Sequence, residues 1–517
     1  MTTLVPRTPY TDDELRKLYP KNLQLHLVQV LMRHGERTPV SARFQNAGLR
    51  QWWPYCASVR QMRSAVLAST NSTTDGAFDV LEWRRRLETF GPNDEPVVAG
   101  GPKGELDDVC DMGSLTDLGR QSTYKLGLRL RQHYVDRLGF LPATITSADF
   151  MYLRSTPVPR ALESLHQTFS ALYPPSARAP GPDGKFPAPT ILARVPNDET
   201  LYPNEGNCRR FAALSRAFAD RAADRWNNTP DMEYLQKVYG KWMAAGSKVA
   251  VDSHPRLSGI MDTVNATDAH GPATKLPKEF YDAKARAIME NISVEEWFDG
   301  FKESKEYRTL GIGALMGDIV GRMVGSIEQP TTQDGANTLL KRSGQEDHSG
   351  RIRFGLSGCH DTTLAGVLAS LGAYETNKWP PFTSHVAIEM FRDAKLPEPL
   401  PQQDPARKSG GGGFFSSVFG SSAAPAGIRR RPTAELTADE KSKLDGYYVR
   451  IRYNDEPVTV PACRLPGNHL EGDESFCTLA AFKAVVDKFT PTNWKQQCRM
   501  NRDQPALPTG EPEWAGH

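Results

Sequence analysis

The sequence predicts an α/β protein whose functional groups gather at the carboxyl ends of neighbouring strands. Three short apolar runs, at 23–31, 150–153 and 351–356, have the length and polar borders of buried strands. Arginine or histidine follows each run, and a helical pattern comes next. Ligands of an open α/β sheet bind where strands end and helices begin. We therefore expect one site built from these three junctions.

The size and composition are those of an ordinary globular protein. The chain has 517 residues, of which 39% are hydrophobic and 24% are charged. This length allows a large core and makes more than one domain the expectation. A net charge of +2 gives no bulk electrostatic reason to expect nucleic acid or an anionic membrane as a partner. No apolar run has the length needed to span a bilayer.

The N-terminus and the cysteines predict an intracellular protein. Residues 1–22 include three consecutive acidic residues and lack the apolar segment of a secretory signal peptide. We expect a cytoplasmic location, with the mitochondrion as the second choice. The seven cysteines are an odd number at wide spacing, which does not resemble a disulfide scaffold. In a reducing compartment we expect free thiols, even for Cys463 and Cys477, which flank one loop.

The first junction reads Arg33-His34-Gly35-Glu36-Arg37 and follows the first strand. The forked donors of arginine match phosphate oxygens two at a time. Neighbouring positive charges disfavour the imidazolium form of His34, and a neutral imidazole can attack phosphorus. The alternative interpretation is a basic surface cluster beside a structural histidine.

The second junction follows a helix that begins near Thr116, a plausible N-cap residue. The strand at 150–153 ends in Arg154, and a helix is predicted from about Pro159 to Leu172. On that helix we expect Arg160 to face outward. Taken alone, this Arg-Ser-Thr segment is weak evidence for a site.

The third junction places His360 and Asp361 between the strand at 351–356 and a helix over 364–371. A carboxyl group at this position could deliver a proton to a ligand at the sheet edge. The structural alternative is that Asp361 only caps the helix that follows.

Together the three segments resemble the histidine acid phosphatase family. Arg33, His34, Gly35, Arg37 and Pro39 match its Arg-His-Gly-x-Arg-x-Pro signature. Its Gly-x-Leu-Thr-x-x-Gly, Arg-Ser-Thr and His-Asp segments follow in the same order. The chain is similar to the intracellular lysophosphatidic-acid-type members and, more distantly, to phytases. The resemblance implies a three-layer α/β/α sandwich, like that of phosphoglycerate mutase, with an inserted helical cap.

The resemblance also implies roles for individual residues. His34 would attack phosphorus, and Asp361 would protonate the leaving oxygen. The phosphate would be held by four side chains, Arg33, Arg37, Arg154 and His360. Neither a metal nor an organic cofactor is expected, and the substrate would be a small phosphomonoester. A phosphomutase-like transfer and a catalytically silent binding protein are the alternatives. The natural substrate and the oligomeric state stay open, and so does a disulfide between Cys463 and Cys477, since secreted members of the family often bridge a similar pair.

The remaining segments complete the expected organisation. A helical patch is predicted within the wall, over 77–90. The strand over 380–391 carries His385 and Glu389, which would either support the site or be ordinary strand-face residues. The predicted parts are an N-terminal extension (1–22), the first part of the core (23–200) with a wall insertion (41–112), a helical cap (201–345), the second part of the core (346–392), a low-complexity disordered loop (393–440) and the end of the core with a tail (441–517).

Overall fold

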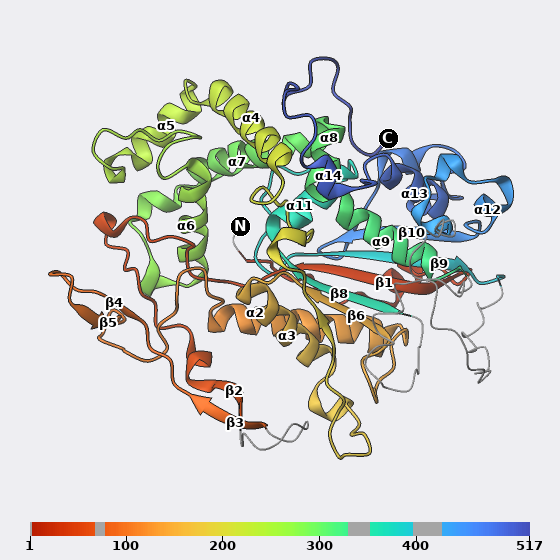
Figure 1. Cartoon of the computed structure of the whole chain (residues 1–517), viewed down its shortest axis with the longest axis horizontal. Coiled ribbons are helices and arrows are strands. Elements are labelled where there is room, and N and C mark those ends of the chain that lie inside the picture. Colours follow the sequence, from red (N-terminus) through yellow and green to blue (C-terminus); the bar gives the residue numbers. More distant parts are fainter. Residues whose placement is uncertain (1–2, 68–77, 329–351, 397–426) are drawn as a thin grey trace, which may run out of the picture.

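A mixed sheet lies at the centre of the molecule (Figure 1). The computed structural model describes residues 3–67, 78–328, 352–396 and 427–517. Within these ranges nine strands form the central sheet in the order β12-β13-β10-β9-β1-β8-β6-β7, with β11 paired to β10. Their bounds are β1 Leu23–Arg33, β6 Met151–Ser155, β7 Ile191–Leu192, β8 Phe354–Cys359, β9 His385–Asp393, β10 Tyr447–Tyr453, β11 Glu456–Val458, β12 His469–Leu470 and β13 Asp473–Thr478.

The parallel strands β1, β8 and β6 bring the three predicted junctions together. Arg33 of β1 lies opposite Cys359 of β8, and Ser155 of β6 lies opposite Gly358. On its other side β1 pairs with the antiparallel strand β9. Because the carboxyl ends of parallel strands share one edge of a sheet, His34, Thr156 and His360 emerge at the same edge.

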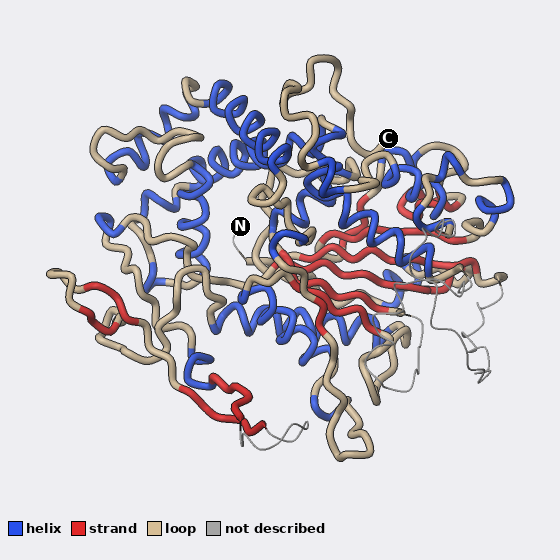
Figure 2. Tube along the Cα trace, in the orientation of Figure 1, coloured by secondary structure: helices blue, strands red, loops and turns tan. Residues whose placement is uncertain are grey.

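Helices cover both faces of this sheet (Figure 2). Successive side chains of β1 point to opposite faces, so Val28 and Val30 belong to one core and Leu27 and Leu31 to the other. The first face is covered by α2 (Asp117–Leu130) and α3 (Pro159–Leu172), and the second by α9 (Ala314–Gly325), α11 (Asp361–Ser370) and α13 (Leu479–Asp487). The predicted α/β fold class is confirmed.

Local sequence explains how α2 begins. The Thr116 hydroxyl accepts the backbone N–H of Gly119, as expected of an N-cap residue. The backbone N–H and hydroxyl of Thr116 both donate to the Glu36 carbonyl, which ties the start of α2 to the loop after His34.

The described part of the predicted cap is built of helices joined by loops. Its helices are α4 (Arg209–Trp226), α5 (Pro230–Tyr239), α6 (Leu257–Ala269), α7 (Ala283–Glu303) and α8 (Lys305–Arg308). Helix α7 runs without a break over 21 residues, and no glycine or proline interrupts 283–299. The boundaries proposed for the cap stay a prediction, since residues 329–351 lie outside the described ranges.

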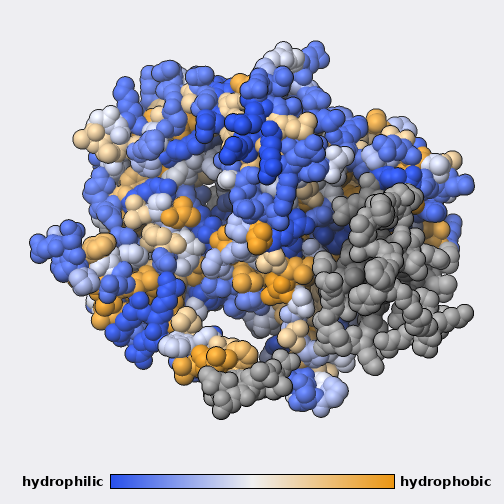
Figure 3. Space-filling view, in the orientation of Figure 1, coloured by the Kyte–Doolittle hydropathy of each residue, from blue (hydrophilic) through white to orange (hydrophobic). Residues whose placement is uncertain are grey.

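The helical patch predicted over 77–90 is wrong. There β3 (Phe78–Trp83) pairs with β2 (Met62–Leu67), and β4 (Glu88–Phe90) pairs with β5 (Pro96–Val98). Aromatic and β-branched side chains in this stretch favour strands, and the pairing strand decides the outcome. Several apolar side chains of the β2–β3 hairpin are exposed, among them Leu67, Phe78 and Val80 (Figure 3).

The expectation of free thiols is also wrong. Disulfides join Cys56 to Cys110, Cys208 to Cys498 and Cys463 to Cys477. The first two pairs could not be predicted from the sequence, because their cysteines are separated by 54 and 290 residues. Only the fold brings their Cα atoms to within 5.2 and 4.7 Å. Cys359 is a free, buried thiol.

The loop predicted to be disordered over 393–440 is ordered at both ends. Residues 397–426 lie outside the described ranges. At the C-terminal end Ile428 is buried beside α9, the Thr433 hydroxyl donates to Asp487 of α13, and α12 spans Ala438–Ser442. The remaining helices are α1 (Asp12–Leu18) and α14 (Trp494–Gln497). Among the described residues, no helix combines the length and apolar character needed to cross a membrane.

Candidate active site

His34 is fixed at the end of β1 with one ring nitrogen free. Its backbone N–H donates to the Cys359 carbonyl at 3.1 Å, and its carbonyl accepts the Thr383 N–H at 3.2 Å. Nδ1 lies 2.8 Å from the Gly35 carbonyl oxygen. A carbonyl only accepts, so Nδ1 carries the proton and Nε2 keeps a lone pair. Gly35 is required here because a Cβ would lie 2.3 Å from the Gly119 carbonyl oxygen.

Two buried arginines, Arg33 at the end of β1 and Arg37 in the loop that follows, flank this histidine. Arg33 Nη2 lies 2.7 Å from Asp361 Oδ2, and Arg33 Nη1 donates to the Pro380 carbonyl. Arg37 Nη2 lies 2.6 Å from Asp262 Oδ1, which belongs to cap helix α6. The Nε atoms of both arginines are buried and have no hydrogen-bond partner among the described residues. Each guanidinium therefore retains donor capacity for an anion.

Arg160 is the site residue that the sequence reasoning missed. It stands in the first turn of α3, and one of its Nη atoms approaches the Gly113 carbonyl at 3.4 Å. Burial and the charge of Arg37 lower its pKa to about 10. Of all the charges that lower the pKa of His34 and of His360, the charge of Arg160 has the largest effect. The sequence did offer a signal for Arg160, because it lies in the first turn of the helix that follows β6. In an α/β sheet, the helices that follow the strands begin at the edge where ligands bind.

Arg154 lies in different surroundings. Its Nη2 donates to Glu199 at 2.6 Å and to the Thr200 hydroxyl at 3.1 Å, and its Nη1 lies 3.8 Å from Asp318. Its Nε and Nη1 form no hydrogen bond with the described residues, but its ion pairs are with Glu199 and Asp318, whereas the charge of Arg160 acts on both His34 and His360. The structure therefore brings Arg33, His34, Arg37, His360 and Asp361 together, joined by Arg160 rather than by Arg154.

Electrostatics keep both histidines neutral. Burial lowers the pKa of His34 well below its usual value, and Arg160, Arg33 and Arg37 lower it further. The His360 ring lies 5.5 Å from that of His34, centroid to centroid. Its Nε2 is 3.1 Å from the Thr156 hydroxyl, and burial and Arg160 lower its pKa as well. His34 can therefore act as a nucleophile even in acid.

Asp361 begins helix α11 and turns toward Arg33. Burial by itself raises the pKa of this carboxyl group, but the Arg33 guanidinium and a hydrogen bond from the Trp379 indole outweigh burial and hold it low. Its Oδ1 accepts the adjacent Thr362 N–H at 2.9 Å, so it also supports the first helical turn. An anion that draws Arg33 away would raise the pKa of Asp361 and let it take up a proton.

The donor set suits an anion better than a metal ion. Over the described ranges, no three side chains among histidine, cysteine, aspartate and glutamate are grouped as metal ligands would be. The edge instead collects three guanidiniums around two neutral imidazoles. Such an arrangement matches a phosphate group.

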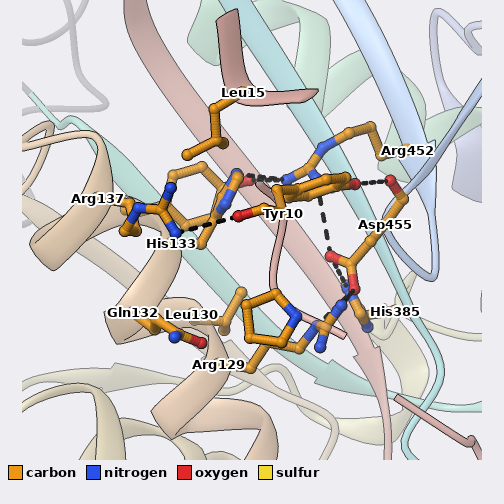
Figure 4. A pocket seen from close by; sticks show the side chains of 13 residues that line it. Tyr10, Leu15, Arg129, Leu130, Gln132, His133, Arg137, His385, Arg452 and Asp455 are labelled. Carbon is orange, nitrogen blue, oxygen red and sulfur yellow. Dashed lines mark hydrogen bonds and ion pairs between the residues drawn. The ribbon is translucent and has the colours of Figure 1, made fainter. Parts of the chain in front are cut away.

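His385 and Glu389 belong to a separate buried ion cluster. Glu389 accepts hydrogen bonds from Tyr19, Tyr134 and Arg450, and Arg452 lies 3.2 Å from it. Figure 4 shows the neighbouring pocket, where His385 Nε2 lies 3.3 Å from Asp455. The N-terminal extension seals this cluster: the Tyr10 hydroxyl donates to the Asp455 carbonyl, and Arg450 donates to that of Leu18.

Comparison with known proteins identifies the family. The profile of the histidine phosphatase superfamily (branch 2) matches residues 24–454. The chain therefore belongs to that superfamily, and the predicted family is confirmed.

Individual relatives cover most of the chain. It is 35% identical to a probable acid phosphatase of Schizosaccharomyces pombe, over 93% of this chain and 95% of that protein. It is 23% identical to human lysophosphatidic acid phosphatase type 6, over 73% of this chain and 76% of that one. The structure of Hafnia alvei phytase in complex with tartrate resembles it with a TM-score of 0.50 at 12% identity, covering 93% and 99% of the two chains. That likeness concerns the fold alone.

Proposed function

We propose that the protein hydrolyses phosphomonoesters through a phosphohistidine on His34. The observation that carries this proposal is the free Nε2 of a neutral His34 among Arg33, Arg37 and Arg160. Membership of the histidine phosphatase superfamily supports it independently.

In the first step His34 Nε2 forms a bond to phosphorus. The bond between phosphorus and the ester oxygen breaks, and its electron pair goes to that oxygen. The three arginines stabilise charge on the phosphoryl oxygens, and neutral His360 lies beside them. Asp361 gives its proton to the departing oxygen, so that an alcohol leaves.

In the second step water attacks the phosphohistidine. Asp361, now a carboxylate, accepts a proton from that water. The bond between phosphorus and Nε2 breaks, and its electron pair returns to the imidazole. Inorganic phosphate leaves, Arg33 pairs with Asp361 again, and Asp361 releases its proton to solvent until the next substrate binds.

Two observations bear on the alternatives. Each group needed for the reaction is present in the site, which speaks against a catalytically silent protein. Transfer back to an organic acceptor would make the protein mutase-like, and the relatives named as acid phosphatases favour water as the acceptor. Lysophosphatidic acid belongs in the substrate panel because relatives are named for it.

We infer an oxidising compartment as the working location. Three disulfides support it, because such bonds persist where thiols are not kept reduced. This proposal replaces the cytoplasmic expectation drawn from the N-terminal residues. Mass spectrometry of protein taken from its natural source, unfolded without reductant and then alkylated, would test it: alkylation of Cys359 alone supports the proposal, and alkylation of all seven cysteines contradicts it.

The test of function is phosphate release combined with trapping of the intermediate. Purified protein is assayed on alkyl, nitrophenyl, inositol and lysophospholipid monoesters between pH 4 and 8. An acid-labile phosphoenzyme should form on His34. His34→Ala should lose at least about 1000-fold in kcat with an unchanged fold. Turnover by that variant within tenfold of the unsubstituted protein would refute the nucleophile.

A further inference from the structure

The segment from Trp379 to Thr383, between α11 and β9, contacts both sides of the site. The Trp379 indole N–H donates to Asp361 Oδ2 at 2.9 Å. The Pro380 carbonyl accepts a hydrogen bond from Arg33, and the Phe382 ring lies 4.2 Å from the centre of the same guanidinium. This segment therefore holds the proposed acid and its arginine partner at once.

The two oxygens of Asp361 have different surroundings. Oδ2 accepts from the Trp379 indole and lies 2.7 Å from Arg33 Nη2. Both of these groups only donate, so a proton on Oδ2 would face two donors. Oδ1 accepts a single backbone N–H, that of Thr362. An arriving proton consequently binds Oδ1 more favourably, even after a phosphate has drawn Arg33 away.

We propose that Trp379 is a positioning residue that makes Oδ1 the proton-carrying oxygen of Asp361 and aims it at the ester oxygen. This inference rests on the proposed function of Asp361 as the acid. The proton passes from Oδ1 to the ester oxygen as the bond to phosphorus breaks. The carboxylate left behind keeps the indole hydrogen bond on Oδ2, which stabilises its negative charge.

Trp379 is itself held firmly, as a positioning residue must be. It is 9% exposed, and its backbone N–H donates to Glu290 of cap helix α7 at 2.9 Å. Its ring lies 4.8 Å from that of Phe298 and edge-on to Trp297 at 6.0 Å. Because α7 provides these three contacts, the cap helix sets the orientation of the acid through Trp379.

Other charges also act on Asp361, and Trp379→Phe leaves them in place. The charged and titratable groups of this region come from β1 and its loop, from α3, from α6, from the end of β8 and from α7. Arg33, Arg37, Arg160 and His360 act on Asp361 directly. Asp262 acts on Arg33 and Arg160, Glu290 acts on Tyr374 as Asp361 does, and the neutral His34 lies beside His360.

The test compares Trp379→Phe with the matched variant Trp297→Phe. The first keeps an aromatic ring but removes the donor to Asp361, and the second makes the same exchange in the neighbouring ring. Removing a hydrogen bond to a charged group should raise the pKa of Asp361 by about one unit in the substrate complex. The basic limb of the kcat profile on an alkyl phosphate should therefore move to higher pH. On the acid plateau, alkyl phosphate turnover should fall about tenfold and nitrophenyl phosphate turnover much less.

A second replacement guards against a folding defect. Benzothienylalanine at position 379 has the shape of tryptophan without the N–H, and it should reproduce the shifted limb. An unmoved limb in both variants, equal losses on both substrates, or the same shift in Trp297→Phe would overturn the inference. If the unsubstituted protein forms no phosphohistidine, the proposed function fails as well. If it does and the limb stays in place, only the role of Trp379 fails.

Discussion

Two clusters of buried charge differ in one respect that separates catalysis from stability. The Glu389 cluster buries both partners: the side chains of Glu389, Arg450 and Arg452 are at most 1% exposed. At the candidate active site the arginines are almost as buried, but Asp361 and Asp262 keep 15% and 17% of their surface. Solvent, and hence a substrate, can reach the carboxylates there.

The partners of the arginines also differ. Glu389 and Arg450 extend from neighbouring strands of one sheet, where Arg450 lies opposite Glu389 in the ladder. Asp262 extends from cap helix α6, and Asp361 from the start of α11. A phosphate can take the place of these two carboxylates on Arg33 and Arg37, whereas no ligand can reach Glu389. The ion pairs of Glu389 therefore stabilise the sheet, whereas those of Arg33 and Arg37 can be replaced by contacts to a bound phosphate.

Glu389→Gln should have the largest effect on stability. It leaves Arg450 and Arg452 without their buried carboxylate, so the free energy of unfolding should fall by about 3–5 kcal/mol in a urea titration. Asp262→Asn is the matched control and should cost less, about 1.5–3 kcal/mol, because the amide oxygen can still accept a hydrogen bond from Arg37. It should instead lower KM, because the lost carboxylate competes with phosphate for Arg37. Equal destabilisation by both changes would erase the distinction between the clusters.

Arg160→Ala and Arg154→Ala separate the two candidate phosphate ligands. Loss of Arg160 should lower kcat/KM about 100-fold, because its charge faces His34 directly. Arg154 pairs with Glu199, so its loss should lower the melting temperature and leave kcat/KM within a few-fold. Steady-state kinetics and thermal unfolding of both variants would test this prediction. A larger loss of kcat/KM in Arg154→Ala than in Arg160→Ala would show that Arg154 is the phosphate ligand.

Asp361→Asn should slow the reaction according to the leaving group. An alkyl phosphate needs the proton in the transition state and should lose on the order of 100-fold, measured where phosphorylation of His34 limits the rate. A nitrophenolate leaves without the proton and should be much less affected. Equal losses on both esters would mean that Asp361 only supports the first turn of α11 or acts in the hydrolysis step.

His133→Gln should flatten the dependence of stability on pH. His133 Nε2 lies 3.2 Å from Arg452, which only donates, so the imidazole is neutral. Burial, followed by Arg452, lowers its pKa to about 3. Between pH 6.5 and 3 the unfolded chain binds a proton that the folded one does not, so the stability falls as the pH falls.

The expected contribution of His133 is about 1.4 kcal/mol per pH unit. Urea titrations at pH 6.5, 5.5 and 4.5 should show this slope reduced in His133→Gln. The exposed His517→Gln is the control and should keep the original slope. Identical slopes in the unsubstituted protein and His133→Gln would show that His133 is not the group responsible.

Local sequence determined the family and four core strands, β1, β6, β8 and β9, together with the helices that follow the site. The run over 23–31 has the apolar pattern of a buried strand, and Arg33-His34-Gly35 comes just after it. Such features depend on neighbours within a few residues, so they can be predicted from the sequence. Asp361 was predicted as part of the site for the same reason, because it lies next to His360 at a strand end.

Tertiary structure alone decided the rest, because those outcomes depend on residues far apart in the chain. The stretch over 78–90 contains strands because β2 pairs with β3 and β5 pairs with β4. Cys208 became bonded because the fold brings Cys498 to it across 290 residues. Arg154 and Arg160 lie at one junction, but only the packing of α3 beside β1 and the position of Glu199 show which of them faces His34. The identity of a charged residue is local, whereas the direction its side chain takes depends on the partners that the whole fold supplies.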